Sequence, residues 1–233
     1  MSFQLFRFRR PEFRHCGSDV AFGSLLILTA SAFGADRPSE DTWSVRAMGI
    51  WSEPKENDLR ILTSGDELEM GFDDAFGASL AIGWQPKGFA FGSEVEYRST
   101  EHEMVSGKLP DLGVITADAT RTVETVFLNA VARQTLDSDL TLFGGIGLGY
   151  SSIDFQLRSL DGDADFNVGQ FSEETISFQG FVGFEKEIAD NLGFVTQFGW
   201  FQADQPRFEN KSTQPFTMDV RGPNLSIGLR YEF

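Results

Sequence analysis

The feature that most constrains this chain is the alternation of apolar with polar or glycine residues in eight separate segments. The final segment, NLSIGLRYEF, shows the alternation most clearly. Successive side chains of a β-strand point to opposite faces, so this period of two predicts strands with one apolar face and one polar face. No stretch approaches the roughly 18 consecutive apolar residues that a transmembrane helix needs. The apolar positions of the final segment are Leu225, Ile227, Leu229, Tyr231 and Phe233.

The alternating segments are joined by links of two lengths. Three links (QPK, LDS and ADN) are tight turns, and the other four, around residues 52–74, 99–121, 151–174 and 203–219, are long and mostly acidic. Each segment is near the ~9–11 residues that a tilted strand needs to cross a bilayer. We therefore expect an all-β fold, an eight-stranded antiparallel up-and-down barrel with tight turns at one end and long loops at the other. The segments span roughly residues 43–51, 75–84, 88–98, 122–134, 139–150, 175–187, 192–202 and 220–233.

The amphipathic aromatic residues support a barrel that spans a membrane. All four Trp and all three Tyr fall near segment ends and on the apolar parity. Such rings prefer the boundary between lipid and water, where they form girdles. A soluble sheet would explain the polar parity but not this placement. The expected girdles are Trp43, Trp84 and Tyr231 at one boundary, and Trp51, Tyr97, Tyr150 and Trp200 at the other.

The opposite parity carries the charges, and we expect it to face the lumen. Charges in a narrow lumen must be paired, so at least one of Glu94 and Glu96 should bond to an arginine across the barrel. Glycines such as Gly147 would relieve crowding, and the charged side is expected to lean into them. The predicted lumen charge network consists of Arg46, Glu94, Glu96, Arg98, Arg133, Glu185, Arg230 and Glu232.

The N-terminus reads as a targeting segment. Four arginines precede the apolar run AFGSLLILTASAFGA, whose end carries small residues. We predict a signal peptide over residues 1–34 and a barrel domain over 35–233. Cleavage after Ala32 is the alternative to cleavage after Gly34. The other interpretation of the apolar run is a short buried or membrane-anchoring helix. Cys16, the only cysteine, lies in the leader, so no disulfide is expected in the mature chain. Without the leader, 15 basic and 33 acidic residues leave a net charge of −18, which argues against nucleic acid as a partner.

Together, the leader, the eight segments, the acidic links and the YEF terminus resemble the small outer-membrane β-barrel proteins of Gram-negative bacteria. This is the porin-like superfamily with eight-stranded members of the OmpA/OmpX type. The resemblance implies a cell outer-membrane location, with lipid and lipopolysaccharide as surroundings and both termini periplasmic. It also implies that residues 225–233 are an assembly signal, read by the barrel-assembly machinery.

The resemblance says little about activity. We expect a structural or surface-interaction role, in envelope integrity or adhesion to an external ligand or host surface, and no enzymatic activity. A narrow solute channel is the alternative. A lipid A-modifying enzyme is less favoured, because His102, expected in a solvated loop, is the only histidine after the leader and has no evident nucleophile beside it.

The acidic link DGDADFNVGQFSEE raises the question of a metal. It has oxygen ligands at the spacing of a calcium loop, but Val168 stands where such a loop needs glycine. We predict no cofactor. Two interpretations of this loop remain: it binds a divalent cation weakly, or it is an acidic loop that its charges keep solvated. The candidate ligands are Asp163, Asp165, Asn167 and Glu174.

Overall fold

The computed structural model describes residues 38–53, 57–62, 67–109, 113–137, 139–160, 169–208 and 215–233. These residues form twelve strands. In this part of the chain no helix is long and apolar enough to cross a membrane. The strands are β1 (Thr42–Ser52), β2 (Asn57–Ile61), β3 (Glu67–Phe72), β4 (Ala75–Gln85), β5 (Phe91–Leu109), β6 (Gly113–Asp137), β7 (Leu140–Leu160), β8 (Gly169–Ala189), β9 (Leu192–Ala203), β10 (Arg207–Phe208), β11 (Phe216–Met218) and β12 (Arg221–Glu232).

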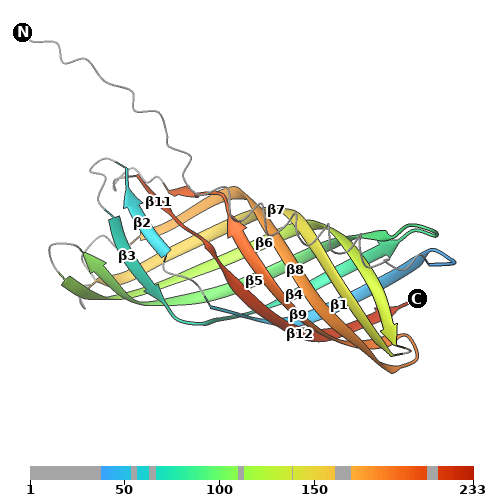
Figure 1. The fold of residues 1–233 in the computed structure, drawn as a ribbon. Coiled ribbons are helices and arrows are strands. Elements are labelled where there is room, and N and C mark those ends of the chain that lie inside the picture. The colour runs from blue at the N-terminus through green and yellow to red at the C-terminus, as the bar shows by residue number, and fades with distance from the viewer. Residues whose placement is uncertain are drawn as a thin grey trace, which may run out of the picture.

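Eight of these strands close into an antiparallel barrel, as the sequence predicted. Their order is β5-β4-β1-β12-β9-β8-β7-β6, and β6 pairs with β5 to complete the ring. The first and last barrel strands are neighbours, with Val45 opposite Tyr231 and Trp51 opposite Leu225. The backbone N–H of Phe233 donates to the carbonyl of Trp43 at 3.0 Å. We call the end that holds this contact and the tight turns the terminal end, at the right in Figure 1.

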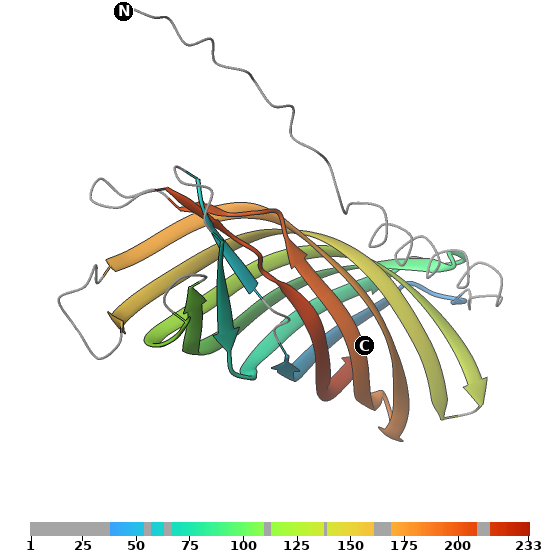
Figure 2. The ribbon, with the colours of Figure 1, turned by 60° about the vertical axis from the view of Figure 1, so that its left-hand side comes forward.

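The four long acidic links are not simple loops, and this expectation was wrong. β5 continues to Leu109, β6 begins at Gly113, β7 continues to Leu160 and β8 begins at Gly169. The links 52–74 and 203–219 contain β2, β3, β10 and β11, which attach to the edge of β5 through β3. Figure 2 shows β7 and β8 (yellow to orange) and the green β5–β6 hairpin projecting at what we call the extended end.

The strands continue because their inward faces have a core to bury. The cluster joins buried apolar side chains from β5 to β11 and from Val220, which precedes β12. Burial of apolar area favours ordered pairing over a solvated loop. The buried members are Met104, Ala119, Val123, Phe127, Ile153, Phe155, Phe171, Phe201, Ala203, Phe208, Phe216, Met218 and Val220.

The outer face of the barrel is apolar, as expected for contact with lipid. Phe76, Leu80 and Leu128 are 74%, 54% and 63% exposed, although a soluble barrel would hide such side chains. At the terminal end the rings of Trp43 and Trp84 stack at 6.1 Å. Tyr231 is also exposed there, and Trp51, Tyr97 and Tyr150 are exposed at the other boundary, with Trp200 partly exposed on the outward parity of β9.

A lysine on the lipid-facing wall should therefore destabilise the barrel. Leu80→Lys places a charge near the middle of β4, and we expect the free energy of unfolding in lipid vesicles to fall by about 2–4 kcal/mol. The matched control is Gln156→Lys, at an exposed position on the extension of β7, which should change little. Equal effects of both substitutions in denaturant titrations would contradict a lipid-facing wall at Leu80.

Candidate functional site: the charged lumen

A network of charges and amides crosses the middle of the barrel. The guanidinium of Arg46 on β1 donates to the carboxylate of Glu94 on β5 and, at 2.5 Å, to Gln197 Oε1 on β9. Arg46 lies 3.8 Å from Glu96 Oε2. All four side chains are buried, and each carboxylate has further donors, so the charges are compensated as burial requires.

Two amides complete this network, and the sequence analysis did not single them out. The Nδ2 of Asn129 on β6 donates to Glu94 at 3.2 Å and to Glu96 at 3.0 Å. The Nε2 of Gln179 on β8 donates to Glu96 at 2.9 Å and to Asn129 Oδ1 at 2.8 Å. The available signal was their inward parity, because both are polar residues on the side of the strand that carries the charges.

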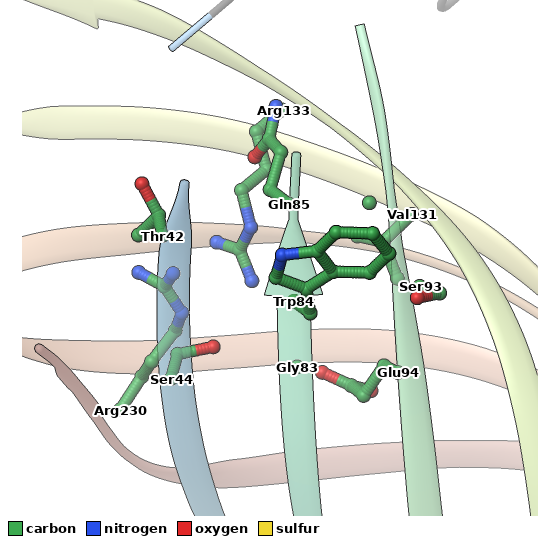
Figure 3. A pocket seen from close by; sticks show the side chains of 11 residues that line it. Thr42, Ser44, Gly83, Trp84, Gln85, Ser93, Glu94, Val131, Arg133 and Arg230 are labelled. Carbon is green, nitrogen blue, oxygen red and sulfur yellow. The ribbon is translucent and has the colours of Figure 1, made fainter. Parts of the chain in front are cut away.

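A second charge cluster lies near the terminal end. Glu185 on β8 accepts from Arg133 Nη1 at 2.6 Å and from Arg230 Nη1 at 3.0 Å, and Arg230 also contacts Glu232 at 2.7 Å. Figure 3 shows Arg133 and Arg230 at a small cavity there, with Glu94 on its far side. The lumen therefore carries compensated charges at two levels.

Aromatic rings and amide side chains, not charges, fill the space beside the lumen glycines of β7. A Cβ on Gly147 would clash with Asn129, and one on Gly149 would lie 2.6 Å from the ring of Phe127. The expectation that charged side chains lean into these glycines was therefore wrong, because aromatic rings and an amide fill the space more completely. Near the mid-barrel network the lumen also holds a cluster of Met48, Val131, Phe143, Phe181 and Val195.

A third group of polar residues lies toward the extended end, beyond the girdle of Trp51 and Tyr97. His102 belongs to it, and its expected position in a solvated loop was wrong. Because β5 continues past Arg98, the inward parity of Glu94 and Glu96 carries on through Thr100 to His102. The imidazole is buried, and its Nε2 lies 3.2 Å from Ser52 Oγ.

The electrostatics around His102 do not favour proton transfer. Burial lowers the pKa of this imidazole to about 2, and the charges of Arg121 and Arg98 act in the same direction. The ring is therefore neutral at physiological pH and a weak base, and its Nδ1 has no hydrogen-bond partner among the described residues. Among the described residues, the Ser52–His102 pair has no acidic group of the kind that orients a histidine in a catalytic triad.

Other predicted residues have separate positions. Arg98 is buried near His102, with its guanidinium 5.4 Å from the Phe201 ring centroid, and is not ion-paired to the mid-barrel network. Of the candidate calcium ligands, only Glu174 lies within the described residues, where its Oε2 accepts from the Tyr150 hydroxyl at 2.5 Å. Asp163, Asp165 and Asn167 lie outside them, as does the predicted signal peptide. No group of metal-ligating side chains occurs in the described ranges.

A closed eight-stranded barrel with an apolar, girdled wall and a charged lumen is the architecture of the small outer-membrane β-barrel proteins, and the chain has that fold. It is similar to the outer membrane protein OprG from Pseudomonas aeruginosa, with 16% identity over 84% of this chain and 97% of that chain and a TM-score of 0.58.

Two further solved structures share the fold. Neisserial surface protein A is 14% identical over 82% of this chain and 97% of its own, with a TM-score of 0.51. A major outer membrane protein from Thermus thermophilus is 13% identical over 83% of this chain and 99% of its own, with a TM-score of 0.52. No family model matches the chain, and no curated protein matches it by sequence.

The mid-barrel network should dominate the stability of the barrel. Glu94→Gln would leave Arg46 without its nearest carboxylate, and we expect a loss of about 3–5 kcal/mol in the free energy of unfolding. Arg158→Gln removes a pair whose side chains are 51% and 59% exposed, and should cost at most about 1 kcal/mol. Denaturant unfolding in detergent compares the two, and equal losses would show that the buried pair is not compensated as described.

Steric filling of the lumen can be tested with glycine substitutions. Gly147→Ala would push Asn129 away from both glutamates, and we expect a loss of about 1–3 kcal/mol. Gly180→Ala is the matched control, because its Cβ would meet nothing within 4 Å. We expect Gly180→Ala to be neutral or slightly stabilising. A neutral Gly147→Ala in the same thermal-unfolding assay would mean that Asn129 is not held in place.

Proposed function

We propose that the protein is an integral outer-membrane barrel with a structural and surface-interaction role, and that its extended end faces the outside of the cell. The observation that carries this proposal is the continuation of four barrel strands beyond the girdle as an ordered wall. The fold and its solved relatives support the outer-membrane location. The tight turns at the terminal end support a periplasmic position for both termini, since barrels of this kind have short periplasmic turns.

The chemistry of this wall favours a basic partner surface. Its outward positions carry exposed carboxylates, and few of the exposed side chains described there are basic. Arg158 is one that does, paired with Asp118 at 3.2 Å. An ordered acidic wall loses little conformational entropy on binding and attracts a cationic partner over a Debye length of roughly 8 Å at physiological salt. The exposed acids are Glu101, Glu103, Asp118, Glu124 and Glu174.

The filled lumen argues against the alternative of a solute channel. A path along the axis would meet the Arg133–Glu185–Arg230 cluster, the mid-barrel network and the apolar cluster of the extended end. Eight strands leave an interior that side chains can fill, and here the described side chains do so. The buried position of His102 inside the barrel likewise disfavours an enzyme that acts on lipid outside it.

The final strand supports a role for the assembly machinery during biogenesis. Leu225, Ile227, Leu229, Tyr231 and Phe233 all lie on the outward parity of β12 or directly after it, and the rings of Tyr231 and Phe233 stack at 6.2 Å. An exposed apolar row of this kind is accessible before the strand is closed against β1. We propose that this row is the surface that the machinery recognises.

Binding by intact cells tests the surface role. We expect cells that produce the protein to bind polylysine-coated beads more than cells that lack it, and the Glu101→Gln/Glu103→Gln variant to lose most of that difference. The matched control is Glu187→Gln/Asp190→Asn, which removes two exposed acids at the terminal end and should change nothing. An equal loss in both variants, or none in either, would contradict the proposed orientation or the proposed surface.

Planar-bilayer recording of the purified protein tests the alternative in parallel. We expect no steady ion conductance from a lumen with these contacts. Steady conductance that changes in Arg46→Gln or Arg230→Gln would establish a channel instead.

A further inference from the structure

A buried arginine without an anionic partner lies in the lumen beyond the girdle. The Arg121 side chain on β6 is 1% exposed, yet no carboxylate contacts it within the described part of the chain. Its contacts are the ring of Phe72, with the guanidinium 4.1 Å from the centroid, and the Met218 sulfur, 3.7 Å from Nη1. Its Nε is buried and makes no hydrogen bond to any residue that the structure describes.

Such a side chain is costly to bury. Burial alone lowers the pKa of Arg121 to about 9, so the guanidinium still carries its charge at physiological pH. A desolvated cation is normally matched by an anion, as Arg46 is by Glu94 in the same lumen. Arg46 thus has a carboxylate of the chain as its partner, whereas Arg121 contacts only an aromatic ring and a sulfur atom among the described residues.

Arg121 shares a cavity with further hydrogen-bond donors. It lies directly opposite His102 in the β5–β6 pairing, and Arg98 and Thr100 occupy the preceding inward positions of β5. These residues and Ser52 line a small cavity that opens to solvent. Arg98 makes no ion pair among the described residues and stacks on Phe201.

The remaining charges lie on the rim of this cavity. Glu53 is exposed there, and Arg221 is paired with Asp219 at 3.5 Å. The rim therefore has one exposed acid, Glu53. In the interior, the charge of Glu96 attracts Arg98 without an ion pair, and Arg121 has no acidic partner among the described residues. An anion in the interior would complete the charge balance that the mid-barrel network achieves with its own carboxylates.

We propose that this cavity binds a small oxyanion, namely a phosphate group, held by Arg121 and Arg98 with Ser52, Thr100 and His102 as neutral partners. Arginine is suited to this role because its planar fork gives paired, charge-assisted hydrogen bonds to phosphate oxygens. Donors on β1, β5 and β6 also suit a tetrahedral anion, whose oxygens point in several directions. The site is inside the barrel, so it does not depend on whether the outer wall binds a partner.

Titration calorimetry of the folded barrel in an uncharged detergent tests this site. Inorganic phosphate and glycerol phosphate serve as separate probes, at constant ionic strength set with chloride, to distinguish the free ion from a phosphate ester. We expect saturable binding of at least one probe. Arg121→Met should weaken that binding by about tenfold or more, because a charge-assisted contact is lost.

Two control variants separate a binding role from a structural one. Arg158→Gln, on the outside of the same extension, should bind the probe like the wild type. Without phosphate, Arg121→Met should unfold at the same or a higher temperature, because an uncompensated buried charge is removed. Thr100→Val, which deletes one hydroxyl from the lining, should weaken binding severalfold and serves if Arg121→Met fails to fold.

Several outcomes would overturn the proposal. One is the absence of saturable binding of either probe by the wild type. Another is unchanged affinity in both lining variants, and a third is an equal loss of affinity in Arg158→Gln. A folded Arg121→Met that unfolds at a much lower temperature and binds phosphate normally would assign Arg121 a structural role through Phe72 and Met218 instead.

Discussion

The whole structure depends on the closure of its backbone hydrogen bonds. In lipid no water is available to an unpaired N–H or carbonyl group, so a sheet can span a membrane only when no edge is left. Here β1 pairs with β12 and β5 pairs with β6, which leaves every membrane-spanning strand with two neighbours. The apolar outer face and the aromatic girdles follow, because a closed wall presents one parity to lipid along its full circumference.

Closure by only eight strands makes the interior narrow, and the lumen residues follow from that. Side chains from different strands meet in it, so a buried charge is costly unless another strand supplies a partner. Glu94 and Glu96 find theirs in Arg46, Asn129 and Gln179, and Glu185 finds two arginines. Where a large ring lies in the lumen, the neighbouring strand carries glycine beside it, as at Gly149 of β7 directly opposite Phe127 of β6.

The extended end is governed by a different balance. Outside the lipid, strand edges can be solvated, and only burial of the inward faces keeps β5 to β8 paired. The aromatic cluster that includes Phe155, Phe171 and Phe216 provides that burial, with Phe171 and Phe216 rings 5.2 Å apart. This ordered extension connects the two proposals, since its outer side carries the acidic wall and its inner side encloses Arg121 and His102.

The sequence by itself determined the eight spanning strands, the parity of each face and the two girdles, because these depend on local alternation and on the uniform thickness of a bilayer. It also indicated which charges face inward. Only the tertiary structure decided that β5 and β6 continue beyond the girdle, that His102 meets Ser52, and that Arg46 pairs with Glu94 while Arg121 pairs with no carboxylate among the described residues. The physical reason is that contacts across a lumen depend on the stagger between strands far apart in the chain, and alternation within one strand carries no information about that stagger.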